Sequence, residues 1–227
     1  MALTDNLVSY WKFDESSGNA ADTVGTNTLT NNNSITYDPG LINNEAGFSS
    51  GSSMYFSNAA ESGLPSGGDA RTINIWTRTT NDNKLQGLFF YGTATPNDMV
   101  AIYLDSRNGI ELLQVNGNGA DYTPSFTWSA NTRYMVTAIY TGTEVHAYVN
   151  ASELGAGSAL TWTTASGTAL NLGRAEGGNY LDGNIDETGV WARALSAAEI
   201  TELYNAGAGL AYPFSGAAAS HFLLMGV

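Results

Sequence analysis

The sequence has 227 residues, of which 43% are hydrophobic and 26 are glycine, so it can bury a core in a chain with many turns. Acidic residues outnumber basic ones by 21 to 8, and the net charge of −13 argues against nucleic acid as a partner. Without cysteine, the chain has no disulfide and no thiolate chemistry. No apolar run reaches the roughly 18 residues of a membrane span, and the first residues have no signal-peptide character.

Short runs rich in β-branched and aromatic residues, separated by Gly, Asn, Asp and Ser, predict an all-β fold. In chain order the expected strands are 7–13, 73–76, 87–91, 99–104, 110–115, 134–140, 144–149 and 169–172. Alternation in the first run predicts that Leu7, Trp11 and Phe13 share one face. The fifth and sixth runs are expected to be antiparallel neighbours. The spacing of the turns is typical of a sandwich or a barrel in one domain.

One helix is predicted near the end of the chain. Ser196 is the expected N-cap, and Glu199, three residues later, completes a capping box. Leu195 and Ile200 occupy the two positions of a hydrophobic staple, and Gly207 is placed to end the helix in the left-handed conformation.

Several segments become informative through their order and spacing. They are 7–18, 21–25, 72–76, 133–140, 146–150, 172–174, 181–187, 191–196 and 203–205. Together they resemble the laminin G-like domains of the concanavalin A-like group over about residues 5–207. In this comparison Trp76 resembles an inward-pointing tryptophan of a central strand. We therefore expect a domain over residues 1–207 and an apolar C-terminal tail over residues 208–227.

The resemblance implies a two-sheet antiparallel jelly-roll sandwich with one short C-terminal helix, in agreement with the predicted strands and helix. It also implies carbohydrate or protein-ligand binding, often with a structural calcium ion. It does not imply one particular ligand, because this fold hosts many functions.

Some proteins with this fold hydrolyse glycans, for which a retaining enzyme needs two carboxylates about 5–5.5 Å apart. Here Asn184 stands where the resemblance would require the first glutamate. Asp186 and Glu187 are adjacent, so on a strand they are expected to point to opposite faces. The sequence has two histidines and no Gly-x-Ser-x-Gly motif, so it offers few residues that could form a nucleophilic triad. We therefore expect a protein that is not an enzyme.

Calcium is the one cofactor that the sequence suggests. Through the resemblance, Asp22, Asp186 and Asp14 lie in loops or strand ends that the fold brings together, and they are the candidate ligands of a structural calcium ion. The alternative is that Asp22 caps a turn and that Asp186 accepts hydrogen bonds from backbone amides.

Glycan recognition commonly stacks a sugar ring on an exposed aromatic side chain beside polar groups. The candidates in predicted loops are Tyr122, Trp128, Trp162, Tyr180, Arg174 and Asn179. By contrast Trp11, Trp76 and Trp191 lie on predicted strands and are expected to be core residues.

No charged residue follows Glu202, and an apolar tail left in water would form a patch of the kind that monomers avoid. Two accounts remain open. The tail covers an edge of its own sandwich, or it docks on another subunit.

Taken together, these features predict a non-catalytic structural or binding protein. The leading hypothesis is a phage virion component, either a capsid decoration or a tail-associated module, because laminin G-like domains resemble parts of phage heads and tails. Such a protein would be made in the host cytoplasm and exposed on the virion surface. Residues 208–227 would contact other virion proteins or a second copy, and the domain would contact cell-surface glycans. The alternative is an extracellular carbohydrate-binding module of a secreted bacterial glycan-processing protein.

Overall fold

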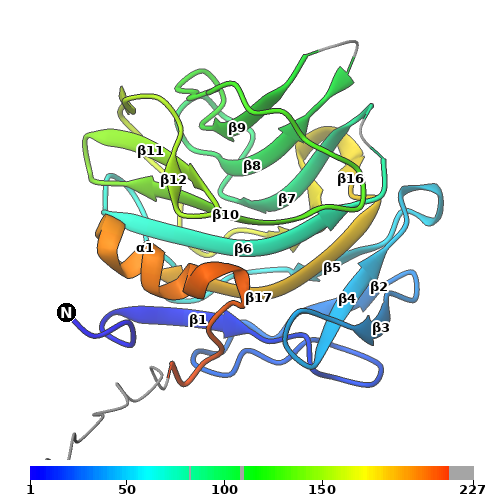
Figure 1. Cartoon of the computed structure of the whole chain (residues 1–227). Helices are drawn as coiled ribbons and strands as arrows, with labels where there is room; N and C mark the ends of the chain where they lie inside the picture. Colours follow the sequence, from blue (N-terminus) through cyan, green and yellow to red (C-terminus); the bar gives the residue numbers. More distant parts are fainter. Residues whose placement is uncertain (82, 108–109, 215–227) are drawn as a thin grey trace, which may run out of the picture.

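The computed structural model describes residues 1–81, 83–107 and 110–214. Two large antiparallel sheets pack face to face, and one short helix lies near the C-terminal end (Figure 1). This arrangement confirms the predicted jelly-roll sandwich. No helix in the described ranges combines the length and the apolar character that a bilayer span requires.

The larger sheet has nine strands, with the path β12-β11-β10-β6-β17-β4-β3; β1 also pairs with β17, and β13 with β11. Its strands are β1 (Leu7–Trp11), β3 (Thr36–Pro39), β4 (Asn44–Phe48), β6 (Arg71–Thr79), β10 (Arg133–Tyr140), β11 (Glu144–Val149), β12 (Ser152–Glu153), β13 (Ser158–Ala159) and β17 (Gly183–Trp191).

The smaller sheet has six strands in the order β2-β5-β14-β7-β8-β9. Its strands are β2 (Thr30–Asn32), β5 (Tyr55–Asn58), β7 (Leu85–Tyr91), β8 (Val100–Asp105), β9 (Leu112–Asn116) and β14 (Leu170–Leu172). A separate two-stranded hairpin, β15 (Arg174–Ala175) and β16 (Asn179–Tyr180), follows β14 directly.

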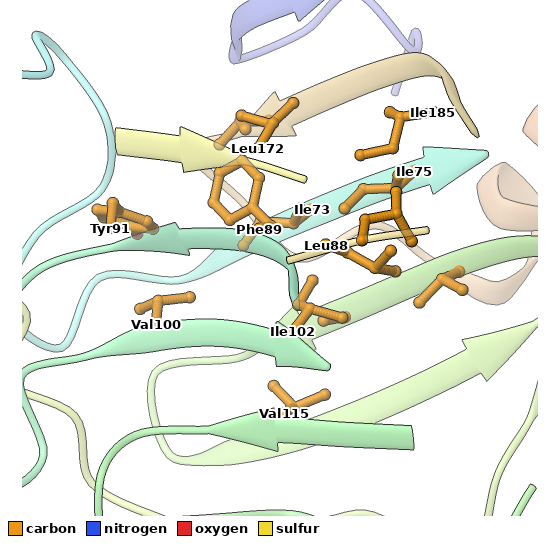
Figure 2. Close-up of a cluster of buried hydrophobic side chains, with 14 of the residues drawn as sticks. Ile73, Ile75, Leu88, Phe89, Tyr91, Val100, Ile102, Val115, Leu172 and Ile185 are labelled. Atoms are coloured by element: carbon orange, nitrogen blue, oxygen red, sulfur yellow. The ribbon is translucent and has the colours of Figure 1, made fainter. Parts of the chain in front are cut away.

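The main hydrophobic core fills the space between the two sheets. Figure 2 shows part of it, with Ile73 and Ile75 from β6 facing Leu88 and Phe89 from β7. All four are at most 1% exposed. Alternate residues of a strand point inward, and a bulge in β7 between Gly87 and Phe89 brings the adjacent Leu88 and Phe89 into the same core. This core fixes which face of each sheet remains outside.

Two predictions about strand neighbours and faces are wrong. The run 110–115 contributes to β9, which pairs with β8 in the six-stranded sheet, whereas β10 pairs with β6 and β11 in the other sheet. Leu7 does not share the core face of Trp11 and Phe13, because the β1 register shifts between Leu7 and Ser9. A bulge of this kind moves the preceding side chain to the opposite face.

A second apolar cluster lies on the outer face of the nine-stranded sheet, beneath α1 (Ala197–Tyr204) (Figure 1). The capping box of Ser196 and Glu199 is confirmed. Trp76 is buried but points outward into this cluster, where its ring stacks on Tyr204 with centroids 5.7 Å apart, so its predicted inward orientation is wrong. The left-handed residue that ends α1 is Asn205, not Gly207, since asparagine tolerates this conformation.

The described part of the tail packs on the domain itself. Leu210, Tyr212 and Phe214 are partly buried against the cluster beneath α1, and the Tyr212 and Phe214 rings lie 5.6 Å and 5.4 Å from the ring of Tyr10. This part of the tail therefore folds back on its own sandwich, and it lies on the outer face of the nine-stranded sheet. The rest of the predicted tail, residues 215–227, lies outside the described residues, and a role of the tail in assembly remains a prediction.

We expect Leu203→Ala to lower the free energy of unfolding by about 2–5 kcal/mol, because Leu203 is 2% exposed and its removal leaves a cavity beneath α1. Urea unfolding followed by tryptophan fluorescence measures the change. Glu202→Ala, on the exposed side of the same helix, is the control. Equal stability of the two variants would show that α1 is not part of the folded core.

Candidate functional site

The β15–β16 hairpin lies against the outer face of the six-stranded sheet, where its strands contact β7. Its turn contains Gly177 and Gly178, both with a φ of +76°, a left-handed conformation that favours glycine. Beneath the hairpin, Gly87 permits a close approach, because a Cβ built there would stand 2.2 Å from the backbone nitrogen of Ala175. Local glycines therefore hold the hairpin on this sheet.

The hairpin places Arg174 beside two tyrosine rings that also contact each other. The guanidinium carbon lies 4.7 Å from the ring centroid of Tyr55 on β5 and 5.6 Å from that of Tyr180 on β16. The two rings are 6.0 Å apart and both are half-buried. Arg174 forms no hydrogen bond or ion pair with any described residue, and its Nε is fully buried. We call Tyr55, Arg174 and Tyr180 the arginine platform.

Polar side chains continue the platform across the sheet. In the strand register, Asn171 on β14 lies opposite Ser57 on β5 and Phe90 on β7. Ser57 follows the core-facing residue Phe56 of its strand, and Asn171 precedes the core-facing residue Leu172 of its strand. Because neighbouring residues of a strand alternate, Ser57 and Asn171 point outward, away from the core. Asn171 is 9% exposed, and its side-chain amide forms no hydrogen bond within the described chain, so its donors and its acceptor are unused.

Three of the six predicted glycan-binding residues come together here. Arg174 and Tyr180 belong to the platform, and Asn179 closes the hairpin turn by donating from Nδ2 to the Glu176 carbonyl oxygen at 2.7 Å. Sequence reasoning missed Tyr55 and Asn171. The signal was present, since each alternates with core residues, Tyr55 before Phe56 and Asn171 between Leu170 and Leu172.

The other three predicted residues lie elsewhere. Trp128 and Trp162 are 5% and 2% exposed, and their indole nitrogens donate to the carbonyl oxygens of Leu112 and Ala120. Neither therefore has an open ring face for a sugar, and the expectation that both are exposed loop residues is wrong. Their long loops fold back over the core, which sequence patterns do not reveal. Tyr122 is half-buried, and its hydroxyl donates to the Leu154 carbonyl oxygen.

A hollow of about 340 Å³ opens on the nine-stranded sheet beside Gly47 and Asp38. Its cation, Arg78, is ion-paired with Glu45 at 3.1 Å and donates to Oδ1 of Asn184 at 2.8 Å. The charge of Arg78 is therefore balanced by a carboxylate, in contrast to that of Arg174.

The three predicted calcium ligands are engaged with hydrogen-bond donors. The carboxylate of Asp22 accepts from the backbone amides of Tyr10, Val24, Gly25 and Asn27 at 2.8–3.1 Å. Asp22 therefore caps a turn, which is the alternative to calcium binding predicted from the sequence. A cation at the same oxygens would face these amide hydrogens, which carry partial positive charge.

The carboxylate of Asp186 also accepts hydrogen bonds from backbone amides. Its Oδ2 accepts from the amides of Leu41 and Ile42 at 2.9 and 3.2 Å, and its Oδ1 accepts from the amide of Glu187 at 2.9 Å. Asp14 accepts from Asn43 and Asn44. Among the described residues, no three acidic or histidine side chains are grouped closely enough to hold a metal ion. The residues present therefore do not fit a calcium site.

We accordingly expect millimolar calcium, or its removal with EDTA, to leave the thermal unfolding midpoint unchanged within about 1 °C. A bound structural cation would instead stabilise the folded state by mass action and raise the midpoint with its concentration. Differential scanning calorimetry at several calcium concentrations makes the comparison, with magnesium at equal ionic strength as the control. A saturable rise that is specific to calcium would restore the proposed metal site.

Asp186 and Glu187 lie at a bulge in β17, where β4 pairs with the first half of the strand and β1 with the second. Both side chains are 1% exposed. The hydroxyl of Tyr10 donates to Oε2 of Glu187, while Oε1 of Glu187 is buried without a partner among the described residues. Burial raises the pKa of Asp186 to about 7, although the amides of Leu41 and Ile42 oppose the shift.

Burial also raises the pKa of Glu187 to about 8, against the lowering effect of the Tyr10 hydrogen bond. The nearby charges of Asp186 and Asp14 raise it further, and Lys12 lowers it. Glu45 likewise raises the pKa of Asp186. Both carboxyl groups therefore keep their protons to a higher pH than exposed carboxyl groups do.

The folded-state pKa values lie above those of unfolded carboxyl groups, about 4, so the folded state binds more protons between the two values. We therefore expect the free energy of unfolding to fall as pH rises from about 4.5 to 8. Urea unfolding across this range measures the slope. Glu187→Gln should flatten it, whereas Glu202→Gln on the exposed face of α1 should not. A slope that is unchanged in Glu187→Gln would exclude this residue as a source.

The geometry defines a lectin-like jelly-roll domain, with an aromatic and polar face on one sheet and a helix on the other. A sequence profile of the concanavalin A-like lectin/glucanases superfamily matches residues 49–201, well over half of the chain. The chain therefore belongs to this superfamily. A comparison with curated protein sequences finds no match.

Solved structures share the fold at low sequence identity. Domain 4 of AbnA, an extracellular arabinanase from Geobacillus stearothermophilus solved with arabinotriose, is 19% identical with a TM-score of 0.70, and the match covers 87% of this chain and 97% of that domain. The binding domain of Paraclostridial Mosquitocidal Protein 1 is 15% identical with a TM-score of 0.70, covering 89% and 52%. Trypanosoma rangeli sialidase is 12% identical with a TM-score of 0.64, covering 90% and 33%.

This chain thus spans nearly all of the arabinanase domain, about half of the mosquitocidal binding domain and a third of the sialidase. At these identities the likeness shows the fold alone.

Proposed function

We propose that this chain is a non-catalytic glycan-binding domain whose binding face is the outer surface of the six-stranded sheet at the arginine platform. The observation that carries the proposal is the convergence, on one face, of two half-buried tyrosine rings and an arginine that has no hydrogen bond or ion pair among the described residues, next to the 9%-exposed side-chain amide of Asn171. Rings stack on the apolar face of a sugar, and the polar groups bind its hydroxyls. The arabinanase domain, which was solved with arabinotriose, supports this proposal.

The placement of the carboxylates supports a binding role over hydrolysis. Asp186 and Glu187 are closed off from solvent at the β17 bulge, on the sheet opposite to the platform. On the platform's own sheet, Asp105 is 1% exposed, forms an ion pair with Arg107 at 2.8 Å and accepts from Gln114 at 2.9 Å. A glycosidase instead requires two carboxyl groups that reach the sugar from either side.

For the biological setting we retain the two hypotheses from the sequence. The first is a phage virion component, a capsid decoration or tail-associated module at the virion surface, which contacts host glycans and joins its partners through residues 208–227. The second is a carbohydrate-binding module of a secreted bacterial protein, and the likeness to a domain of an extracellular arabinanase favours it. The same binding face serves either setting.

We expect Tyr55→Ala and Tyr180→Ala each to weaken glycan binding about 5- to 30-fold, because truncation of an aromatic anchor costs about 1–2 kcal/mol. A glycan array identifies ligands of the intact domain, and isothermal titration calorimetry measures the affinities of the variants. Tyr204→Ala, which removes a ring on the opposite sheet, is the matched control, with thermal unfolding as a check on folding. Equal binding by all three variants would place the glycan site elsewhere.

A further inference from the structure

The eight basic side chains differ in how their charges are balanced. Five form ion pairs with carboxylates, and these are Arg78, Lys84, Arg107, Arg133 and Arg193. Arg71 is buried and donates to backbone carbonyls and to the hydroxyl of Tyr91. Within the described ranges, Lys12 and Arg174 have neither an ion pair nor a hydrogen bond. In a chain with 21 acidic residues, the unpaired guanidinium is a specific feature of the platform.

The surroundings of Arg174 leave its donors unused. A ring contact occupies the face of a guanidinium, whereas its five N–H donors lie in the plane of the group. The rings of Tyr55 and Tyr180 therefore restrict the side chain without satisfying those donors. Its buried Nε has already lost water as a partner, which is unfavourable unless an acceptor replaces the water.

We propose that Arg174 binds the carboxylate of an acidic sugar, so that the ligand of the arginine platform is an oligosaccharide containing a uronic or sialic acid residue. This inference rests on the glycan-binding function proposed above. A carboxylate offers two oxygens that match the planar fork of arginine, whereas one sugar hydroxyl offers a single acceptor. The tyrosine rings and Asn171 then hold the remainder of the sugar.

The net charge of the whole chain restricts the class of acidic glycan that can bind. A net charge of −13 repels polyanions, and at physiological ionic strength this repulsion is screened beyond about 8 Å. A single carboxylate in contact with Arg174 is attracted at short range, whereas a glycan with a charge on every sugar is also repelled by the net negative charge of the chain. The ligand therefore carries its acidic residue among neutral sugars.

The test uses the intact domain and a panel of matched oligosaccharides. Each pair contains one glucuronic, galacturonic or sialic acid residue among neutral sugars, together with the same oligosaccharide after reduction of the carboxyl group to an alcohol. Titration calorimetry measures both members of each pair. We expect the acidic member of at least one pair to bind about 10- to 100-fold more tightly.

Two substitutions examine the residue itself. Arg174→Gln should abolish the preference for the acidic member, and Arg174→Lys should restore little of it, because an ammonium group has no planar fork. Lys12→Gln removes the other unpaired cation with the same change in net charge, and it should keep the preference. Thermal unfolding confirms that each variant is folded.

The outcomes separate the two proposals. Both members of every pair could bind at the platform with equal affinity, or Arg174→Gln could keep the preference for the acidic member. Either result would overturn the proposal of an acidic ligand and leave the proposal of glycan binding standing. If no member of the panel and no glycan on the array binds, both proposals are overturned. Loss of the preference in Lys12→Gln would assign it to net charge and would also overturn the role of Arg174.

Discussion

The pairing of β17 along both of its edges is the constraint on which the rest of the structure depends. Its nine residues are all buried, with β6 along one edge and with β4 and then β1 along the other. Segments near residues 10, 45, 75 and 187 are thereby joined in one sheet. Since such pairing is non-local, the sandwich forms only when both ends of the domain are in place.

The change of partner from β4 to β1 explains the acids that look functional in the sequence. At the bulge, ladder hydrogen bonds are interrupted, and Asp186 instead accepts the amides of Leu41, Ile42 and Glu187. Glu187 is buried beside Tyr10 in the same gap. A pair of carboxyl groups that resembles catalytic or metal-binding residues in sequence therefore closes a discontinuity in the sheet. Burial is the largest cause of the raised pKa values of both carboxyl groups.

The outer faces of the two sheets differ in the segments that cover them. The helix α1 and residues 210–214 lie on the nine-stranded sheet, where they cover Tyr10, Trp76 and other apolar side chains (Figure 1). On the six-stranded sheet, the short β15–β16 hairpin contacts β7 and β8. The hairpin leaves the Tyr55 and Tyr180 rings half-buried and holds Arg174 beside them. This is the face on which we propose that the ligand binds.

The fold class, eight of the strands within a few residues, and the N-terminus of α1 were predictable from the amino-acid sequence, because these depend on alternation, turn chemistry and capping between near neighbours. Arg174, Asn179 and Tyr180 were among the six candidate glycan-binding residues, but the hairpin that brings them together was not predicted. Only the tertiary structure decided that β9 and β10 lie in different sheets, that Trp128 and Trp162 are buried, and that Tyr55 and Asn171 join the arginine platform. Those outcomes depend on contacts between segments tens of residues apart, and the local pattern of polar and apolar residues carries no information on which distant segments will meet.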